Sequence, residues 1–321
     1  GRASCACGSC SGFARVSQVG AYMSGLLALR LCLLATLTAA GAVRRVLVTG
    51  ANKGIGLQIC KKIVATQPDV HVVLGSRSAS RGEKAVADVL ASEPSAAGRV
   101  EMLQLDVSDE ASVAAAASEL AARYPSEPTP LHGLCNNAGV GFGRSIRETL
   151  ATNFYGSVRC CAHFVPLIEA EGRVCNVASA SGPNFVRGLD AEQKAIFTSR
   201  ATSWEALDAC LQRYAESTDY EGVAYGLSKA AVNQWTMQLA AEHPQLRVNS
   251  CSPGYILTDL TAGMGATKRP EESNCHVAPL YLLFGDVPHP EANKGRYYGS
   301  DAVRSPIDVY RGPGDPPYEG D

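Results

Sequence analysis

A tyrosine and a lysine one helical turn apart have the spacing in this sequence that most directly suggests chemistry. Tyr225 and Lys229 frame the segment Tyr-Gly-Leu-Ser-Lys, and residues at i and i+4 share one face of a helix. A phenol, with a pKa of about 10, is a poor acid or base at neutral pH. A nearby ammonium favours the phenolate and lowers that pKa. The pair could therefore transfer protons, although the same pattern also arises by chance in ordinary helices.

A glycine-rich turn after the first apolar run could hold a phosphate group. The turn reads Thr49-Gly-Ala-Asn-Lys-Gly-Ile-Gly56, and apolar residues recur at helical spacing after it. Glycines allow a sharp turn and a close approach of pyrophosphate to the backbone, and the start of a helix adds unpaired N–H donors. Strand, turn and helix in this order predict a nucleotide site. The alternative is an ordinary turn that happens to be rich in glycine.

Two cations stand where a nucleotide-binding domain selects its coenzyme. The second apolar run ends in Gly75-Ser76-Arg77, and Lys53 lies within the glycine turn. An NAD-binding domain places an acid on the ribose 2′-hydroxyl about twenty residues after its glycine turn. Cations in its place suit a 2′-phosphate, which favours NADPH. The alternative is that both are hydrated surface charges.

Later apolar runs also end in polar or small residues. Strands are expected at residues 46–48, 70–74, 100–105, 131–135, 173–177, 247–252 and 295–299. Strands that alternate with helices predict a single α/β domain with a doubly wound parallel sheet of the Rossmann type. Ligands bind beyond the carboxyl ends of such strands. The residues gathered there would be Asp106, Val107, Asn136, Asn137, Ala138, Gly139, Ser179, Pro253 and Gly254, with Thr258 just beyond.

Two further polar residues are ambiguous by themselves. Asn153 lies in a helix expected over residues 150–168, and Ser179 follows the fifth strand. An asparagine in a helix usually makes a structural hydrogen bond, and a serine after a strand is usually a turn residue. Either could instead belong to a site.

Composition narrows the partners and the compartment. A net charge of −2 over 321 residues gives no reason to expect nucleic acid or an anionic membrane as a partner. Most of the twelve cysteines lie in apolar patterns, where free thiols behave as small hydrophobic groups, so we expect a reducing compartment. Cys5, Cys7 and Cys10 lack a nearby fourth ligand, and no metal site is expected.

The ends of the chain differ from its centre. Residues 1–44 contain no acid and carry an apolar run broken by Arg30. This extension is typical of a signal segment or of an organelle transit peptide, and cytoplasmic and organellar locations both stay open. The run is marginal as a membrane span. The polar, Pro- and Gly-rich residues 301–321 are expected to be disordered.

A long insertion precedes Tyr225. Residues 184–221 contain two expected helices, near 190–197 and 203–215. Thr202 and Glu205 have the spacing of a capping box at the start of the second helix.

Together these motifs resemble those of the short-chain dehydrogenase/reductase family, over roughly residues 44–300. The glycine turn is similar to the family's Thr-Gly-x-x-x-Gly-x-Gly, residues 136–139 match its Asn-Asn-Ala-Gly, and residues 253–254 match its Pro-Gly. Lys53, Arg77 and the insertion resemble the NADPH-dependent carbonyl reductases. In those enzymes a similar insertion covers the helices through which other members associate, which implies a monomer. Ala178 departs from the pattern, since a second serine is common there.

The resemblance implies a role for each site residue. Tyr225 would act as general acid, Ser179 would hold the carbonyl oxygen, Lys229 would lower the pKa of Tyr225 and bind the nicotinamide ribose, and Asn153 would hold a water. The cofactor-binding residues implied are Gly50, Asn52, Lys53, Gly54, Ile55, Gly56, Arg77, Asp106, Val107, Asn137, Ala138, Gly139, Tyr225, Lys229, Pro253, Gly254 and Thr258.

The function expected from this resemblance is reduction of an aldehyde, ketone or quinone by hydride transfer from NADPH. The partner is then a small-molecule carbonyl substrate. Two alternatives stay open. One is an organellar ketoacyl or steroid reductase, and the other is a regulatory protein that binds NADPH without turnover.

Overall fold

The computed structural model describes residues 43–217, 222–287 and 295–320, together with Gly1. The contacts divide the chain into residues 1–43 and 44–321, and the following concerns the second unit. Residues 2–42 of the expected extension, with the cysteines at positions 5, 7 and 10, and the last residues of the insertion lie outside the described residues. Arg44, expected as the last residue of the extension, instead begins the first strand. Within the described part, no helix is both long and apolar enough to span a bilayer.

Eight strands of the described chain form one sheet in the order β3-β2-β1-β4-β5-β6-β7-β8. Strands β1 to β7 run parallel, and β8 pairs antiparallel with β7. The strand bounds are β1 Arg44–Val48, β2 Val70–Ser76, β3 Val100–Gln104, β4 Leu131–Asn136, β5 Ile168–Val177, β6 Arg247–Cys251, β7 Tyr297–Tyr298 and β8 Arg304–Ser305. The strand order reverses between β1 and β4, which confirms the doubly wound sheet.

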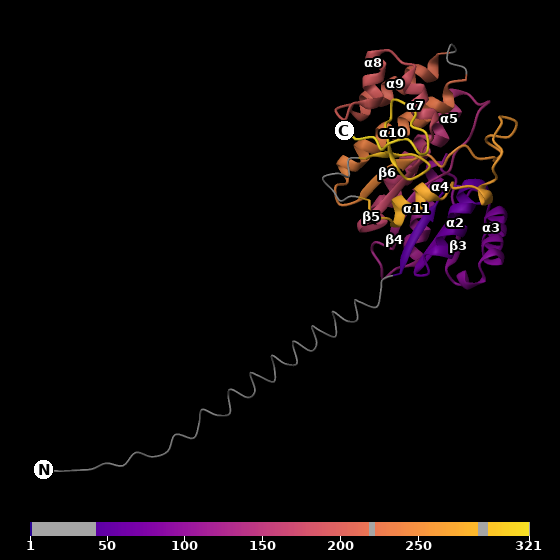
Figure 1. The fold of residues 1–321 in the computed structure, drawn as a ribbon. Helices are drawn as coiled ribbons and strands as arrows, with labels where there is room; N and C mark the ends of the chain where they lie inside the picture. Colours follow the sequence, from indigo (N-terminus) through magenta and orange to yellow (C-terminus); the bar gives the residue numbers. More distant parts are fainter. Residues whose placement is uncertain (2–42, 218–221, 288–294, 321) are drawn as a thin grey trace. The chain divides into compact units, whose positions relative to one another are not determined.

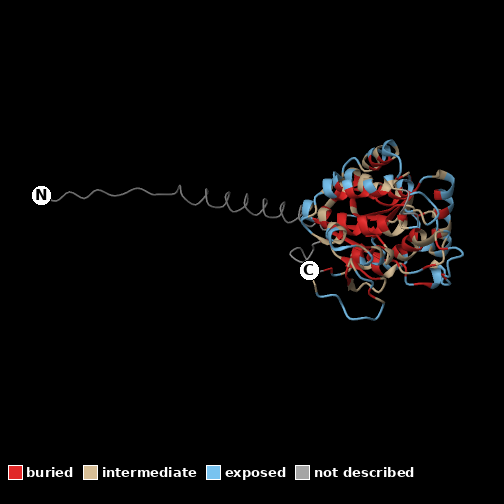
Figure 2. Ribbon diagram, turned by 90° about the horizontal axis from the view of Figure 1, so that it is seen from above, coloured by how far each residue is buried: buried red, intermediate tan, exposed pale blue. Residues whose placement is uncertain are grey.

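Helices cover both faces of the sheet (Figure 1). One buried apolar cluster lies under α2, α3 and α11, and the other under α4, α5, α6, α10 and the helices of the insertion. Figure 2 shows the strands as buried and the outer helix faces as exposed. The bounds are α2 Gly54–Thr66, α3 Ala79–Ser92, η1 Pro94–Ala96, α4 Glu110–Arg123, α5 Ile146–Asn153, α6 Tyr155–Phe164, η2 Val165–Leu167, α7 Ser181–Arg187, α8 Ala191–Thr198, α9 Trp204–Glu216, α10 Ala224–Glu242, η3 Pro270–Glu272 and α11 Val277–Phe284.

The helix expected over residues 150–168 was wrong in its bounds. The segment forms α5, then α6, and then the short η2, whose first turn holds Pro166. Proline cannot donate a helical hydrogen bond, so β5 already begins at Ile168, five residues before the expected strand. Apolar residues continue at similar spacing from α6 through η2 into β5. Their periodicity therefore did not indicate where the helix ends and the strand begins.

The two helices expected within residues 184–221 are present as α8 and α9, and α7 precedes them. The expected cap was one residue off. Ser203, rather than Thr202, is the N-cap of α9, and its side chain accepts a hydrogen bond from the backbone of Ala206.

The expected disorder of residues 301–321 is contradicted for the part that the structure describes. Arg311 is buried and forms a two-pronged ion pair with Asp301, with N–O distances of 3.0 and 2.9 Å. It also donates to the carbonyl of Pro316 at 2.9 Å, and β8 extends the sheet. Polar contacts order this segment. Such contacts do not require a periodic pattern of apolar residues, so the sequence contains no sign of this order.

The cysteines of the described chain are free and buried thiols, as expected. The described residues contain no cluster of side chains suited to a metal ion.

Candidate functional site

The carboxyl ends of the strands lie at one edge of the sheet because the strand register aligns them. Val48 pairs with Leu74 on one side and with Cys135 on the other. The glycine turn, Arg77 and residues 136–139 therefore follow at the same edge. Parallel strands thus gather into one region the motifs that are far apart in the sequence.

Tyr225 and Lys229 lie on the first turns of α10, beside Ser179 at the end of β5. The side chain of Ser179 forms a hydrogen bond with that of Tyr225. Lys229 is buried, with its Nζ 5.6 Å from the centre of the Tyr225 ring, and it donates to the carbonyl of Val177 at 2.8 Å. These three expected residues are brought together.

The pKa of Tyr225 shifts in the direction opposite to that expected. Burial raises the pKa of Tyr225 to about 12, and the hydrogen bond with Ser179 offsets only part of that rise. Burial also lowers the pKa of Lys229 to about 8, because its ammonium loses hydration. Desolvation therefore dominates both pKa values, and the phenol is protonated at neutral pH.

Asn153, the last residue of α5, ties a loop to α10. Its side-chain amide donates to Ser228 Oγ at 3.1 Å and to the carbonyl of Val140 at 3.0 Å, and its oxygen accepts from the N–H of Val140 at 2.8 Å. A role in holding water stays a prediction. The geometry shows that Asn153 fixes the loop beside Gly139 against the helix that carries Tyr225.

The glycine turn is joined to the end of β4. Thr49 Oγ1 accepts from the backbone N–H groups of Asn137 and Ala138, both at 3.0 Å. A Cβ on Gly50, whose φ is +63°, would lie 2.8 Å from Ala138 Cα, and one on Gly56 would lie 2.5 Å from Asn137 Nδ2. Both glycines are therefore required by close approach.

The start of α2 has the features of an anion site. No side chain caps it, and its first turn contains no acid, so its N–H donors and partial positive charge are free to act on a ligand. The two expected cations, Lys53 and Arg77, are exposed. These residues fit a dinucleotide with a phosphorylated ribose.

Two other expected cofactor residues, Asp106 and Val107, differ in their surroundings. The pKa of Asp106 lies below its usual value. Burial raises this pKa, but the hydrogen bonds from Ser108 and the charge of Arg77 together lower it by more. Val107 is a core residue against Gly156, where a Cβ would lie 2.9 Å from Val107 Cγ2. The side chain of Val107 is thus structural, and its carbonyl accepts a hydrogen bond from Arg159 at 3.2 Å.

The segment after β6 approaches the start of α2. Gly254 adopts a φ of +94° after Pro253. The methyl group of Thr258 lies 3.5 Å from where a Cβ on Gly54 would be. Ile55 packs on the core under α2. These residues therefore lie or pack near the carboxyl edge of the sheet, where the glycine turn lies.

Sequence reasoning missed Phe142. Its ring centre lies 4.8 Å from that of Tyr225, tilted by 42°, and the side chain is 44% exposed. A single aromatic residue between two glycines gives no periodic signal. The one available signal was its position three residues after Gly139.

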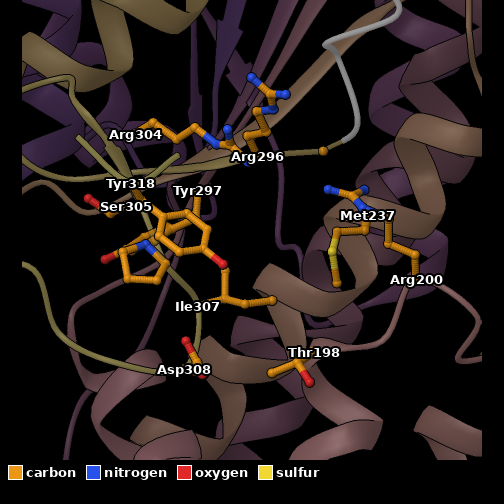
Figure 3. Close-up of a pocket in the computed structure, with 12 residues that line it drawn as sticks. Thr198, Arg200, Met237, Arg296, Tyr297, Arg304, Ser305, Ile307, Asp308 and Tyr318 are labelled. Carbon is orange, nitrogen blue, oxygen red and sulfur yellow. The ribbon is translucent and has the colours of Figure 1, made fainter. Parts of the chain in front are cut away.

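A separate cavity of about 120 Å³ lies between the end of α8, the middle of α10 and the C-terminal segment (Figure 3). Its lining includes Met237, Tyr297 and Ile307 but none of the expected site residues. It is therefore distinct from the region beside Tyr225.

Comparisons with known proteins agree with these motifs. The sequence profile for short chain dehydrogenases matches residues 44–190, and a profile described as enoyl-(acyl carrier protein) reductase matches residues 209–283. Carbonyl reductase (NADPH) 1 of Macaca fascicularis is 31% identical over 273 residues, which cover 77% of this chain and 94% of that protein. The chain belongs to the short-chain dehydrogenase/reductase family.

Other members of this family show the same relationship. Human carbonyl reductase (NADPH) 1 is 32% identical over 74% of this chain and 90% of its own length. Salutaridine reductase from Papaver somniferum superposes with a TM-score of 0.65 at 25% identity, over 77% of this chain and 98% of its own. Menthone neomenthol reductase from Mentha piperita superposes with the same score and identity, over 81% and 100%. Reductases named for different substrates thus share this fold.

Proposed function

We propose that this protein reduces a carbonyl group of an aldehyde, ketone or quinone to an alcohol, with NADPH as hydride donor. The carrying observation is the half-buried, protonated Tyr225, hydrogen-bonded to Ser179 with Lys229 one turn away, at the edge of the sheet where the glycine turn lies. The relatives named as NADPH carbonyl reductases support the same activity.

The site residues divide the work between binding and proton transfer. The hydride comes from NADPH when it is bound. The glycine turn and the uncapped start of α2 would hold its pyrophosphate, Lys53 and Arg77 its 2′-phosphate, and the segments at residues 137–139 and 253–258 the nicotinamide side.

Tyr225 donates its proton to the carbonyl oxygen as negative charge develops there. Ser179 donates a hydrogen bond to the same oxygen, and this bond strengthens as the charge grows. Lys229 stabilises the phenolate that remains after proton donation. Asn153 keeps the loop that carries Phe142 in place, so that the substrate meets a constant wall.

Turnover assays test this proposal. NADPH consumption is followed with a panel of quinones, aldehydes and ketones, with NADH in parallel. We expect reduction of at least one class and a clear preference for NADPH. Absence of reduction across the panel, with NADPH still bound, would instead support the regulatory alternative.

We also propose that the protein is a monomer. The insertion packs on α5 and α10, with Trp204 stacked on Phe154 at 5.9 Å. It thereby covers the helix surface that other members use for association. Sedimentation should give a mass near that of one chain, and a tetramer would contradict this.

The signal and transit interpretations of residues 1–44 stay predictions. A fluorescent fusion carrying this segment would distinguish secretory, organellar and cytoplasmic destinations. A matched fusion without the segment is the control.

A further inference from the structure

An ion pair links the glycine turn to a segment two hundred residues later in the chain. Nζ of Lys53, the N-cap residue of α2, contacts the carboxylate of Asp259 in the segment between β6 and α11. Both side chains are exposed, at 61% and 80%. The hydrogen bond and charge of Lys53 hold the pKa of Asp259 below its usual value. The carboxylate is therefore ionised. It pairs with the Lys53 ammonium, which the proposed function assigns to binding the coenzyme.

The position of Asp259 is set by the backbone around it. Thr261 Oγ1 accepts from the N–H of Thr258 at 3.0 Å and donates to the carbonyl of Ile256, which closes a tight turn. The N–H of Leu257 donates to the backbone carbonyl of Lys268 at 2.8 Å. These contacts fix the backbone on both sides of Asp259.

Two contacts place this turn against the start of α2 and the loop after β4. Thr258 lies against Gly54, and Leu260 lies so close to Gly141 that a Cβ there would be 2.6 Å from Leu260 Cγ. Residues 270–272 also pack on α2. In Figure 1 the orange segment after β6 extends toward the side of the molecule where the indigo α2 begins. Asp259 is thus presented to Lys53 by contacts on both sides.

We infer that Asp259 is a coenzyme-selectivity residue. Its carboxylate pairs with the Lys53 ammonium, and the 2′-phosphate of NADPH must displace it in order to bind there. This inference rests on the proposed use of NADPH. A carboxylate and a phosphate are both acceptors of ammonium hydrogen bonds, and the phosphate carries more charge. Two anions on one ammonium repel each other, so the phosphate replaces the carboxylate rather than joining it. Asp259 therefore lowers the affinity for NADPH and leaves NADH unaffected.

Equilibrium binding of NADPH and of NADH to the full chain tests this inference. Asp259→Asn should bind NADPH about two- to fivefold more tightly, the range that an exposed ion pair of this kind contributes. NADH affinity should not change. In a Lys53→Met background, the same substitution should have no effect beyond a weak general charge effect, because its target is gone.

Glu271→Gln is the matched control, since it removes one exposed acid from the same segment. It should leave both affinities unchanged, and melting temperatures of all variants show that they remain folded. Unchanged or weaker NADPH binding in Asp259→Asn overturns the inference, as does equal tightening for both coenzymes.

The failures of the two proposals are distinguishable. If Lys53→Met weakens NADPH binding while Asp259→Asn has no effect, only the role of Asp259 is wrong. If the unmodified protein shows no preference for NADPH over NADH, the proposed coenzyme is wrong and the inference falls with it.

Discussion

The two ends of the cleft use charged and polar groups in opposite surroundings. At the catalytic end, Lys229 is 5% exposed and burial dominates the pKa values of Tyr225 and Lys229. At the coenzyme end, Lys53 and Asp259 are exposed and paired. A buried group loses hydration, so each contact changes the free energy strongly, whereas water screens an exposed pair. We therefore expect substitutions at the catalytic end to have large effects and those at the coenzyme end smaller, coenzyme-selective effects.

Of the substitutions that compare the two ends, Ser179→Ala at the catalytic end should lower kcat most. Removal of a hydrogen-bond donor to a developing oxyanion lowers kcat by about 10²- to 10³-fold. The dissociation constant for NADPH should change little, because Ser179 contacts Tyr225 and not the coenzyme end. Steady-state kinetics and equilibrium binding check both parts. A loss confined to NADPH affinity would break the division between the two ends.

Lys229 should make stability depend on pH. Its folded pKa of about 8 is below the unfolded value, so above about pH 8 the unfolded chain binds more protons and the stability contributed at this position rises toward about pH 10. Between about pH 7 and about pH 10, the free energy of unfolding of the native sequence relative to Lys229→Met should rise by about 2 kcal/mol. Denaturant titrations at both pH values measure this, and a constant difference would show that Lys229 is not desolvated.

Arg77→Met should have a smaller and selective effect. Loss of an exposed charge-assisted contact with the 2′-phosphate should weaken NADPH binding about tenfold. NADH binding should stay within error, because it lacks the phosphate. Titration with each coenzyme decides the matter. An equal loss for both would mean that Arg77 supports the fold of the cleft and does not select the coenzyme.

The smallest expected effect is that of salt on coenzyme binding. Raising the ionic strength from about 0.05 M to about 0.5 M shortens the Debye length from about 14 Å to about 4 Å. This should weaken NADPH binding several-fold through Lys53 and Arg77 while kcat at saturation changes little. Kinetics at both ionic strengths measure this. If kcat falls as much as the affinity for NADPH, the charges at the catalytic end are also screened by salt, and the contrast between the two ends is wrong.

Local patterns predicted much of this molecule. The strands, the glycine turn and the residues at strand ends were recognisable because parallel sheets align these ends, whichever residues lie between them. The free buried cysteines followed from apolar surroundings in the same way. Such features depend on short segments, and a sequence displays them directly.

Contacts between distant segments could not be predicted in that way. Lys53 contacts Asp259 because the segments after β1 and β6 converge, and Phe142 contacts Tyr225 because the loop after β4 meets the start of α10. Arg311 orders the C-terminal segment through polar contacts, which produce no apolar period. The pKa of Tyr225 was expected to fall because Lys229 is one turn away, but a sequence does not show how fully α10 is buried there.

The central claim is that the Tyr225 hydroxyl supplies the proton in carbonyl reduction beside an intact coenzyme site. Tyr225→Phe, compared with the native chain in NADPH titration and in turnover of the best substrate, tests it most directly. We predict that NADPH affinity stays within about twofold and that kcat falls by at least about 10²-fold, the scale of general acid catalysis. Turnover equal to that of the native chain would contradict the claim.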